Sequence, residues 1–407
     1  MTRPGRIAWG QALLWGAFLA CSWTWCIGMF LPVLLVRDFG TLGFVVFAVP
    51  NVLGAGVMGW VMARPLESHA FVRRHLLACR AFTIVTIAFQ VSFLAWFMDM
   101  LHIGSQPGAT LVMLALGIGL VAAVMSPTRL DPWLACGVLV FSVCVFVRVL
   151  TGDHATVLPR TSLMSPGSLP TTHILWLAPV CIFGFALCPY LDLTFHRARQ
   201  SAHSATGTAA FTLGFGVFFL AMILLTLAYA PMFIGRDGHI ARLPAMLIAA
   251  HIGVQALFTI HLHARHVPTP GSIQSWRGRV ALIAGVGFVA IAGFAPHVTA
   301  RLNVVHGLSP AEAVYRGMMV FYGLIFPAYV WLCAIPTRDG HSGLGGRAGR
   351  RKGLILILAV SLALPAYWLG FLARETPWLG LGLGVILFAR LALPQRTAVT
   401  DTPEAHS

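Results

Sequence analysis

The sequence predicts an all-α polytopic membrane protein with about twelve transmembrane helices. Hydrophobic residues make up 58% of its 407 residues, and charged residues make up only 10%. Apolar runs long enough to cross a hydrocarbon core, which takes roughly 20 helical residues, recur from one end of the chain to the other. A soluble domain of this size could not bury so much apolar surface, so we expect these runs to lie in a lipid bilayer.

Each expected span is an apolar run bounded by glycine, proline or arginine, which are typical of helix ends and loops. The spans are placed at residues 8–36, 41–63, 80–101, 109–127, 132–150, 173–195, 208–233, 243–263, 279–298, 314–335, 353–373 and 377–393. The run at 109–127 is short, and the run at 377–393 is rich in glycine.

The basic residues predict the orientation of these spans. The formal charge is +15, but the 27 Lys and Arg residues lie in the breaks between apolar runs, which disfavours nucleic acid as a partner. Counted over alternate loops, one side collects 18 of them and the other eight, while Arg390 lies within the last span. Because cytoplasmic loops collect Lys and Arg, we expect both termini in the cytoplasm and the chain in a bacterial inner (cytoplasmic) membrane.

The loop at residues 151–172 divides the chain after five spans. A second five-span unit would then enter the membrane from the opposite side, as in the inverted repeats of many secondary transporters. The first spans of the two units begin at 8 and 173, and the second spans begin at 41 and 208, which are similar offsets. The expected organisation is a first repeat (1–150), an extracytoplasmic loop (151–172), a second repeat (173–335), two C-terminal spans (336–393) and a disordered cytoplasmic tail (394–407).

The first span of each unit carries a candidate helix break. Residues 20–32 and 179–192 each combine small or polar residues with glycine and proline near the middle of a span. Proline removes a helical hydrogen bond, and backbone freed in this way is tolerated in a membrane where it is buried or lines a cavity. The pattern predicts either a pair of discontinuous helices around a binding site or two simple proline kinks.

This arrangement resembles the LeuT-type (APC superfamily) sodium-solute symporters over residues 8–335. The resemblance implies that substrate lies between the first spans of the two repeats and that sodium lies between spans 1 and 8. The matching positions are Ser22, Thr24, Gly28, Gly184, Asp192 and Thr259. The family's paired hydroxyls on span 8 are absent, since only Thr259 stands there, so coupling to sodium or to protons stays open.

Polar side chains within the spans supply further candidates. Asp192 is either a cation- or proton-binding carboxylate or a surface residue paired with Arg197 or Arg199. His251 is a candidate proton relay, whereas His261 and its neighbours are expected at the membrane interface. The candidate substrate-binding residues are Ser22, Trp23, Thr24, Trp25, Gly28, Asn51, Gln90, Gly184, Tyr190, Asp192, His251 and Gln255, and the candidate ion-binding residues are Thr24, Gly28, Asp192 and Thr259.

These observations predict a secondary active transporter, a permease for a small solute, that is coupled to Na⁺ or H⁺ by alternating access. No hydrolase, nucleotide-binding or zinc-protease motif is present, so we expect no enzymatic activity, no cofactor and no metal site. The alternative is a non-transporting integral membrane protein, either an enzyme or a sensor subunit, that uses His, Cys and Asp residues within its spans.

Overall fold

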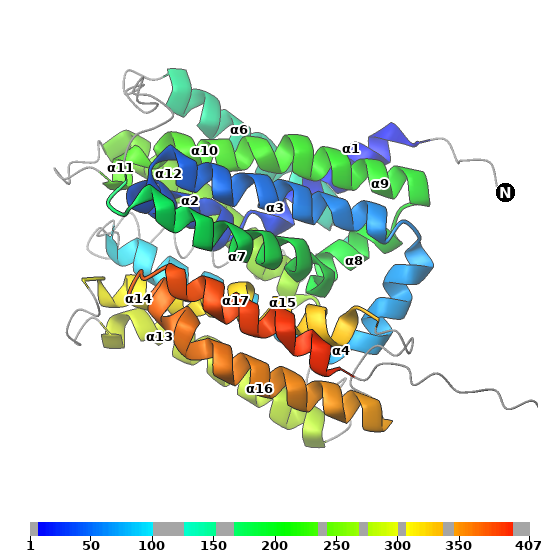
Figure 1. Cartoon of the computed structure of the whole chain (residues 1–407). Helices are drawn as coiled ribbons and strands as arrows, with labels where there is room; N and C mark the ends of the chain where they lie inside the picture. The colour runs from blue at the N-terminus through cyan, green and yellow to red at the C-terminus, as the bar shows by residue number, and fades with distance from the viewer. Residues whose placement is uncertain are drawn as a thin grey trace, which may run out of the picture.

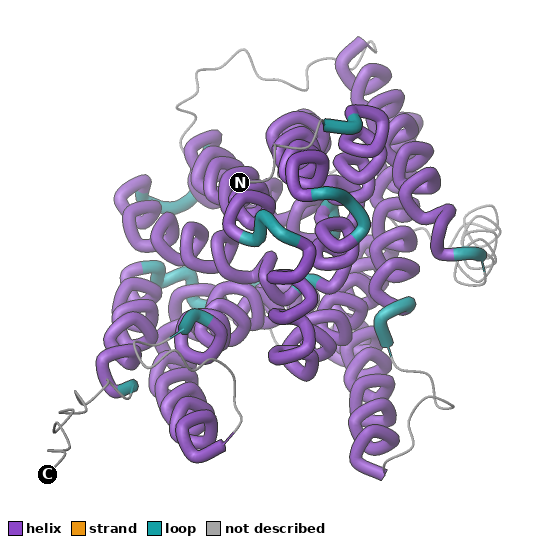
Figure 2. The backbone as a smooth tube through the Cα atoms, turned by 90° about the vertical axis from the view of Figure 1, so that its right-hand side faces the viewer, coloured by secondary structure: helices purple, strands orange, loops and turns teal. Residues whose placement is uncertain are grey.

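The computed structural model describes residues 7–100, 126–151, 167–234, 242–267, 276–299, 307–336 and 346–393. Within these ranges the chain is helical and contains no strand (Figure 2). The helices run side by side along one direction, so their loops gather at two opposite ends of the bundle (Figure 1). The chain therefore has the architecture of a multi-pass helical membrane protein.

The first span is broken. Helix α1 (Trp9–Trp23) and helix α2 (Cys26–Phe39) meet at an angle of 58°. Between them Thr24 has a ψ of 74°, and Trp25 is extended with φ −110° and ψ −169°. The interruption predicted between Cys21 and Gly28 is therefore confirmed at Thr24 and Trp25.

Helix α3 (Thr41–Val61) follows directly, and α4 (Pro65–Met100) begins well before the predicted start at residue 80. Pro65 is pre-organised for the first helical position, and Glu67 accepts a hydrogen bond from the Arg64 N–H. A kink at His75 (φ −117°, ψ 21°) separates this polar first part of α4 from the apolar span that follows. A 3₁₀ turn, η2 (Thr128–Leu130), leads into α6 (Asp131–Thr151), whereas the span expected at 109–127 lies almost wholly outside the described residues.

The second half begins with a similar interruption. A 3₁₀ turn, η3 (Thr171–His173), precedes α7 (Ile174–Leu187), which continues into a second turn, η4 (Cys188–Leu191). Asp192 then leaves helical geometry with ψ 112°, and its side chain caps the short helix α8 (Leu193–Gln200) by accepting from the Thr194 N–H. The chain therefore leaves helical geometry at Asp192, which follows a stretch, Thr171–Leu191, that is long enough to cross a membrane by itself.

The remaining helices follow the predicted spans closely. The structure has α9 (Ser204–Leu213), the π-helical η5 (Gly214–Phe219), α10 (Leu220–Tyr229), α11 (Pro231–Ile234), α12 (Arg242–Ala264) and α13 (Trp276–Thr299). It continues with α14 (Pro310–Val320), the π-helical η7 (Phe321–Ile325), α15 (Phe326–Tyr329), the π-helical η8 (Val330–Ala334), α16 (Gly346–Phe371), α17 (Pro377–Ala389) and η9 (Arg390–Ala392). The π-helical segments widen two of these spans, a distortion that is frequent at functional sites.

In the described part of the chain, eight helices are long and apolar enough to cross a membrane, and the bent α1–α2 pair would make nine. Two further apolar helices, Ile283–Ala292 and Pro377–Ala392, are shorter. The prediction of a multi-pass helical protein is confirmed. The prediction of about twelve spans is not decided, because one of them falls outside the described residues.

Close helix packing holds the two broken spans in place. Helix α3 packs against α7 and α9, while α1 packs against α6, α9 and η5. The approach of α3 to α7 depends on Gly54, where a Cβ atom would lie 2.4 Å from the Phe185 carbonyl oxygen. Gly59 is similarly tight against the Phe211 side chain. The glycine face of α3 therefore serves helix packing.

Candidate functional site

The break in the first span opens onto a small central cavity. Its lining consists of Trp23, Trp25, Ile27, Gly28, Asn51, Phe185, Cys188 and Tyr322. The cavity encloses about 260 Å³ of space between atoms, with room for about one water molecule. Because α2, α3, α7 and η7 all contribute to this lining, a change at either broken helix would alter its size.

Side chains from other helices satisfy the backbone freed at the break. The Cys26 N–H at the start of α2 donates to the Gln90 Oε1, 2.9 Å away on α4. Pro32 has no N–H for the Gly28 carbonyl one turn earlier, and the Thr226 hydroxyl donates to that carbonyl instead, at 3.0 Å. The interruption is therefore a built feature of the bundle and more than a proline kink.

Asn51 fixes the aromatic wall of the central cavity. Its Oδ1 accepts a hydrogen bond of 2.7 Å from the Trp23 indole Nε1–H, and both residues are buried. The Trp25 ring meets Tyr322 edge-on, with ring centroids 4.7 Å apart. The wall is therefore mainly aromatic, with one amide as its polar group.

A larger cavity adjoins the central one and extends to the end of the bundle where α2 finishes and α14 begins, which we call the Arg37 end. It lies between α2, α7, α14, η7 and the end of α16 and has room for a few water molecules. Cys181 and Gly184 line its middle, while Asp38, Arg316 and Arg374 line its polar rim. Phe185 and Tyr322 line both cavities, so these two side chains form the partition between them.

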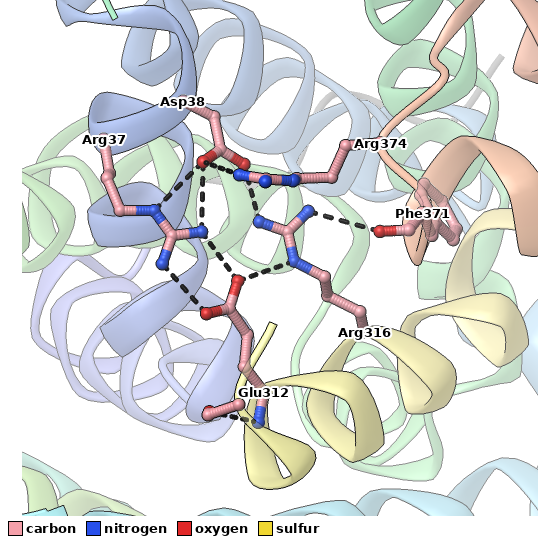
Figure 3. A network of polar contacts seen from close by, with 7 residues as sticks. Arg37, Asp38, Glu312, Arg316, Phe371 and Arg374 are labelled. Atoms are coloured by element: carbon pink, nitrogen blue, oxygen red, sulfur yellow. Dashed lines mark hydrogen bonds and ion pairs between the residues drawn. The ribbon is translucent and has the colours of Figure 1, made fainter. Parts of the chain in front are cut away.

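Five charged side chains close this Arg37 end, and we call them the Arg37 network (Figure 3). Arg37 binds both oxygens of Glu312 at 2.6 and 2.9 Å. Arg316 bridges Glu312 at 2.8 Å and Asp38 at 2.6 Å, and Arg374 lies 3.8 Å from Asp38. The network joins α2 to α14 and to the chain after α16.

The Arg37 network carries an excess of positive charge. Three arginines face two carboxylates, which leaves a formal charge of +1 when all five groups are ionised. The two carboxylates are almost fully buried, whereas the arginines are between 12% and 30% exposed. Breaking such a buried network by removing one partner is costly, because it leaves an uncompensated charge.

A second charged network lies at the opposite end of the bundle, which we call the Asp131 end. Asp131, fully buried at the start of α6, accepts from Arg197 of α8 at 2.6 Å and from His261 of α12 at 2.9 Å. Arg265, just beyond α12, donates to the same carboxylate at 3.0 Å. We call these four residues the Asp131 network, and it ties α8 to both α6 and α12.

Helix α8 is also bound to the start of α4. The His196 Nδ1 lies 2.8 Å from the Ser68 hydroxyl, and its Nε2 lies 2.8 Å from the Tyr190 carbonyl. Burial lowers the pKa of His196 from 6.5 to about 4, so the ring is neutral near pH 7. A neutral ring that donates from Nε2 to Tyr190 and accepts at Nδ1 from Ser68 satisfies both contacts.

The structure distributes the sequence-predicted residues over several places. Trp23, Trp25, Gly28 and Asn51 line the central cavity, and Gly184 lines the larger one. The Ser22 and Thr24 hydroxyls bond to carbonyls of their own helix, Leu19 and Ala20. Gln90 caps α2, and the Tyr190 ring packs near Phe71.

His251 and Gln255 belong to a separate buried cluster. His251 Nδ1 lies 3.1 Å from the Ser142 hydroxyl, and Gln255 Nε2 donates to the same hydroxyl at 3.2 Å. Gln255 also approaches the Cys21 sulfur at 3.9 Å. This cluster joins α12 to α6 and α1, and none of these four side chains lines the central cavity.

The four candidate ion-binding residues do not form one site. No hydrogen bond or ion pair within the described chain links Asp192 to Thr24, Gly28 or Thr259. The Thr259 hydroxyl is buried without a hydrogen-bond partner among the described residues. Asp192 is fully buried and pairs with neither Arg197 nor Arg199; its Oδ1 accepts from the Thr194 N–H and hydroxyl instead.

Sequence reasoning missed the two charged networks and the partition. His261 and His263 were expected at the interface, but both are only 1% exposed, because each packs toward a buried carboxylate. Glu312 and Asp131 carry the signal that could have found the networks, since each is a carboxylate at the first turn of an apolar span. Their arginine partners lie on other helices, which the sequence alone does not show.

Comparison with known proteins assigns no family: no protein-family model matches the chain, and no curated protein sequence matches it.

Proposed function

We propose that the protein is a secondary active transporter that moves a small solute by alternating access. The observation that carries the proposal is a cavity at a broken helix together with a separate charged network at each end of the bundle. Alternating access requires two such closures, of which one opens at a time. The Arg37 network and the Asp131 network join different helices, so each can open without breaking the ion pairs of the other.

The helix packing supports an inverted repeat of five plus five spans, followed by the two C-terminal helices α16 and α17. In such a repeat, α1 of the first unit corresponds to α7 of the second, and α3 corresponds to α9. The contact of α1 with α9 therefore corresponds to the contact of α7 with α3, and both contacts are extensive. Helix α6, the fifth span of the first unit, corresponds to the span that contains η7 and α15. The contact of α1 with α6 therefore corresponds to the contact of α7 with η7 and α15, which is also present. Together with the broken α1–α2 span and the non-helical Asp192 after η4, this pattern supports the resemblance to LeuT-type symporters.

The cavity supports a solute that is compact and partly apolar. Its aromatic wall offers stacking surfaces, and Asn51 offers one amide. Pockets that bind small molecules typically combine a mostly apolar lining with few polar groups. Transport would require the central cavity to widen, and the partition of Phe185 and Tyr322 lies between it and the larger cavity.

Native cysteines provide a test of opening at the Arg37 end. Cys181 lines the larger cavity and Cys188 lines the central one, and both are buried, whereas Cys144 is exposed. We expect Glu312→Gln to speed modification of Cys181 by a water-soluble maleimide by about tenfold, because the network then loses a charge. Mass spectrometry of protein in lipid nanodiscs would measure the rate, with Cys144 as internal reference.

The matched control is Glu67→Gln. Glu67 also pairs with an arginine, Arg64, but that pair lies on the surface, with side chains 46% and 77% exposed. Exposed pairs contribute little, so this variant should label at the wild-type rate. Equal Cys181 rates in wild type and Glu312→Gln would contradict a gate at the Arg37 end.

A measurement of solute uptake distinguishes a transporter from a non-transporting membrane protein. Proteoliposomes with an imposed Na⁺ or H⁺ gradient would be given a defined mixture of small solutes, and the solutes taken up would be identified by mass spectrometry. Gradient-dependent accumulation supports the transporter. A network that opens without any gradient-dependent uptake would favour the alternative, a sensor subunit or another non-transporting membrane protein.

A further inference from the structure

A buried carboxylate and a buried imidazole face each other at the second helix break. Asp192 Oδ2, between η4 and α8, lies 4.0 Å from His263 Nε2 on α12. The two side chains are 0% and 1% exposed. Neither atom has a hydrogen-bond partner within the described residues, although buried polar atoms nearly always have one.

The surroundings of the pair do not suit a metal ion. The other carboxylate oxygen already accepts two hydrogen bonds from Thr194. Sodium and other hard cations need several oxygen ligands, whereas the groups nearest Asp192 and His263 are a thiol, a phenol and the Thr83 hydroxyl. The described part of the chain gathers no three His, Cys, Asp or Glu side chains that could hold a metal ion.

The charges around the pair leave a carboxylate at Asp192 without a cation. The titratable groups that face it are His263 from α12, Cys79 from α4 and Tyr322 from η7. On α8 itself, His196 is bonded to Ser68 and Tyr190, and Arg197 is bonded to Asp131. Beyond α12, His266 interacts electrostatically with His263, and within the described chain the one ion pair of Asp192 is with His263.

We infer that Asp192 and His263 together form a proton-binding site that takes up one proton from water and returns it. The proton resides on Asp192 Oδ2, which faces the unpaired His263 Nε2, and its loss leaves a carboxylate that is stabilised by Thr194 and the Phe195 backbone but by no cation. A buried charge of this kind is costly in a low-dielectric interior. Deprotonation therefore favours a state in which water reaches Asp192.

The position of the pair connects this proton to the Asp131 end. Asp192 caps α8, which carries Arg197 of the Asp131 network five residues later, and His263 follows His261 of the same network on α12. Moving α8 away from α12 would admit water to Asp192 and break the Asp131 network in one step. The link between the proton and the opening of the Asp131 end rests on the proposed function, because it makes the proton the coupling ion. The proton-binding site itself does not depend on the proposed function.

Infrared difference spectroscopy of the purified protein in nanodiscs tests the site without a transported solute. A protonated carboxyl group absorbs at its own carbonyl stretching frequency, separate from that of the carboxylate. We expect a carboxyl band that titrates with pH in wild type and disappears in Asp192→Asn, whose amide retains the ability to cap α8. His263→Gln should keep the band and move its midpoint by about one pH unit or more, because a neighbouring titratable group is lost.

His75→Gln is the matched control. His75 is also a buried histidine, but it contacts Tyr329 at 3.0 Å and lies outside the pair. It should leave the band and its midpoint unchanged. A titrating band that persists in Asp192→Asn, or a midpoint that His263→Gln does not move, would overturn the assignment.

A second measurement separates this site from the proposed function. Spin labels on the exposed residues Ser201 and Leu77, in a Cys144→Ala background, would report the distance from the end of α8 to α4 as pH is changed. A pH-dependent distance that Asp192→Asn abolishes supports proton coupling. A carboxyl band that titrates while the distance stays fixed retains the proton site and rejects its link to transport.

Discussion

At the scale of single residues, the break in the first span depends on a few long-range hydrogen bonds. The Gly28 carbonyl loses its helical hydrogen-bond donor because residue 32 is proline. The Thr226 hydroxyl, 198 positions further along the chain, donates to that carbonyl instead. The Gln90 side chain likewise supplies the missing partner of the Cys26 N–H. These bonds make the broken conformation the satisfied one, which explains how such a span persists in an apolar environment.

The Trp23–Asn51 bond gives a prediction at this scale. Asn51→Leu keeps most of the side-chain volume but leaves the buried indole N–H unpaired, so we expect unfolding free energy to fall by about 1–3 kcal/mol. In a Trp23→Phe background, which lacks the indole N–H, Asn51→Leu should lower the unfolding free energy by clearly less. Denaturant unfolding in detergent micelles, run as a double-mutant cycle, measures the difference. An equal cost in both backgrounds would show that the bond contributes nothing.

At the scale of helices, close packing between α3 and α7 positions the partition residue Phe185. Helix α3 approaches within contact of the α7 backbone only because position 54 has no Cβ. The helix that carries Asn51 thus lies directly against the helix that carries Phe185. The width of the central cavity is therefore set partly by one glycine.

Gly54→Ala tests this packing. The added Cβ would lie 2.4 Å from the Phe185 carbonyl oxygen, so the helices must separate. We expect a loss of about 1–3 kcal/mol in stability, as in other overpacked interiors, together with faster maleimide labelling of Cys188. Gly137→Ala on α6, where nothing lies within 4 Å of the new Cβ, should be neutral or slightly stabilising. Thermal unfolding of both variants would decide, and similar melting temperatures would contradict the tight contact.

At the scale of the whole molecule, composition and hydropathy predicted the helical membrane class and most helix positions. They also predicted the break in the first span, because proline, glycine and polar residues change the local backbone. They did not predict that Arg37 binds Glu312 or that Asp131 binds Arg197, since those partners lie on helices far apart in the chain. The same holds for His263, whose environment depends on how α8 packs against α12.

The distribution of arginine predicts that the Asp131 end faces the cytoplasm. Ser201 lies exposed at that end, and Ser168 lies exposed at the Arg37 end beside the Arg37 carbonyl. In a Cys144→Ala background, Ser168→Cys should react with an impermeant maleimide on intact cells, whereas Ser201→Cys should react only after permeabilisation. The reverse pattern would invert the orientation.

The partition between the two cavities gives the molecule two barriers of very different speed. Phe185 and Tyr322 line both cavities, and the Tyr322 hydroxyl is hydrogen-bonded to Thr86 at 3.1 Å, so a local movement of these two side chains is the smallest change that would join the cavities. Opening the Arg37 end requires whole helices to move, which takes microseconds to milliseconds. Because the central cavity has room for about one water molecule, the fast side-chain movement admits only water to the broken helix, and anything larger has to wait for the slow movement of helices.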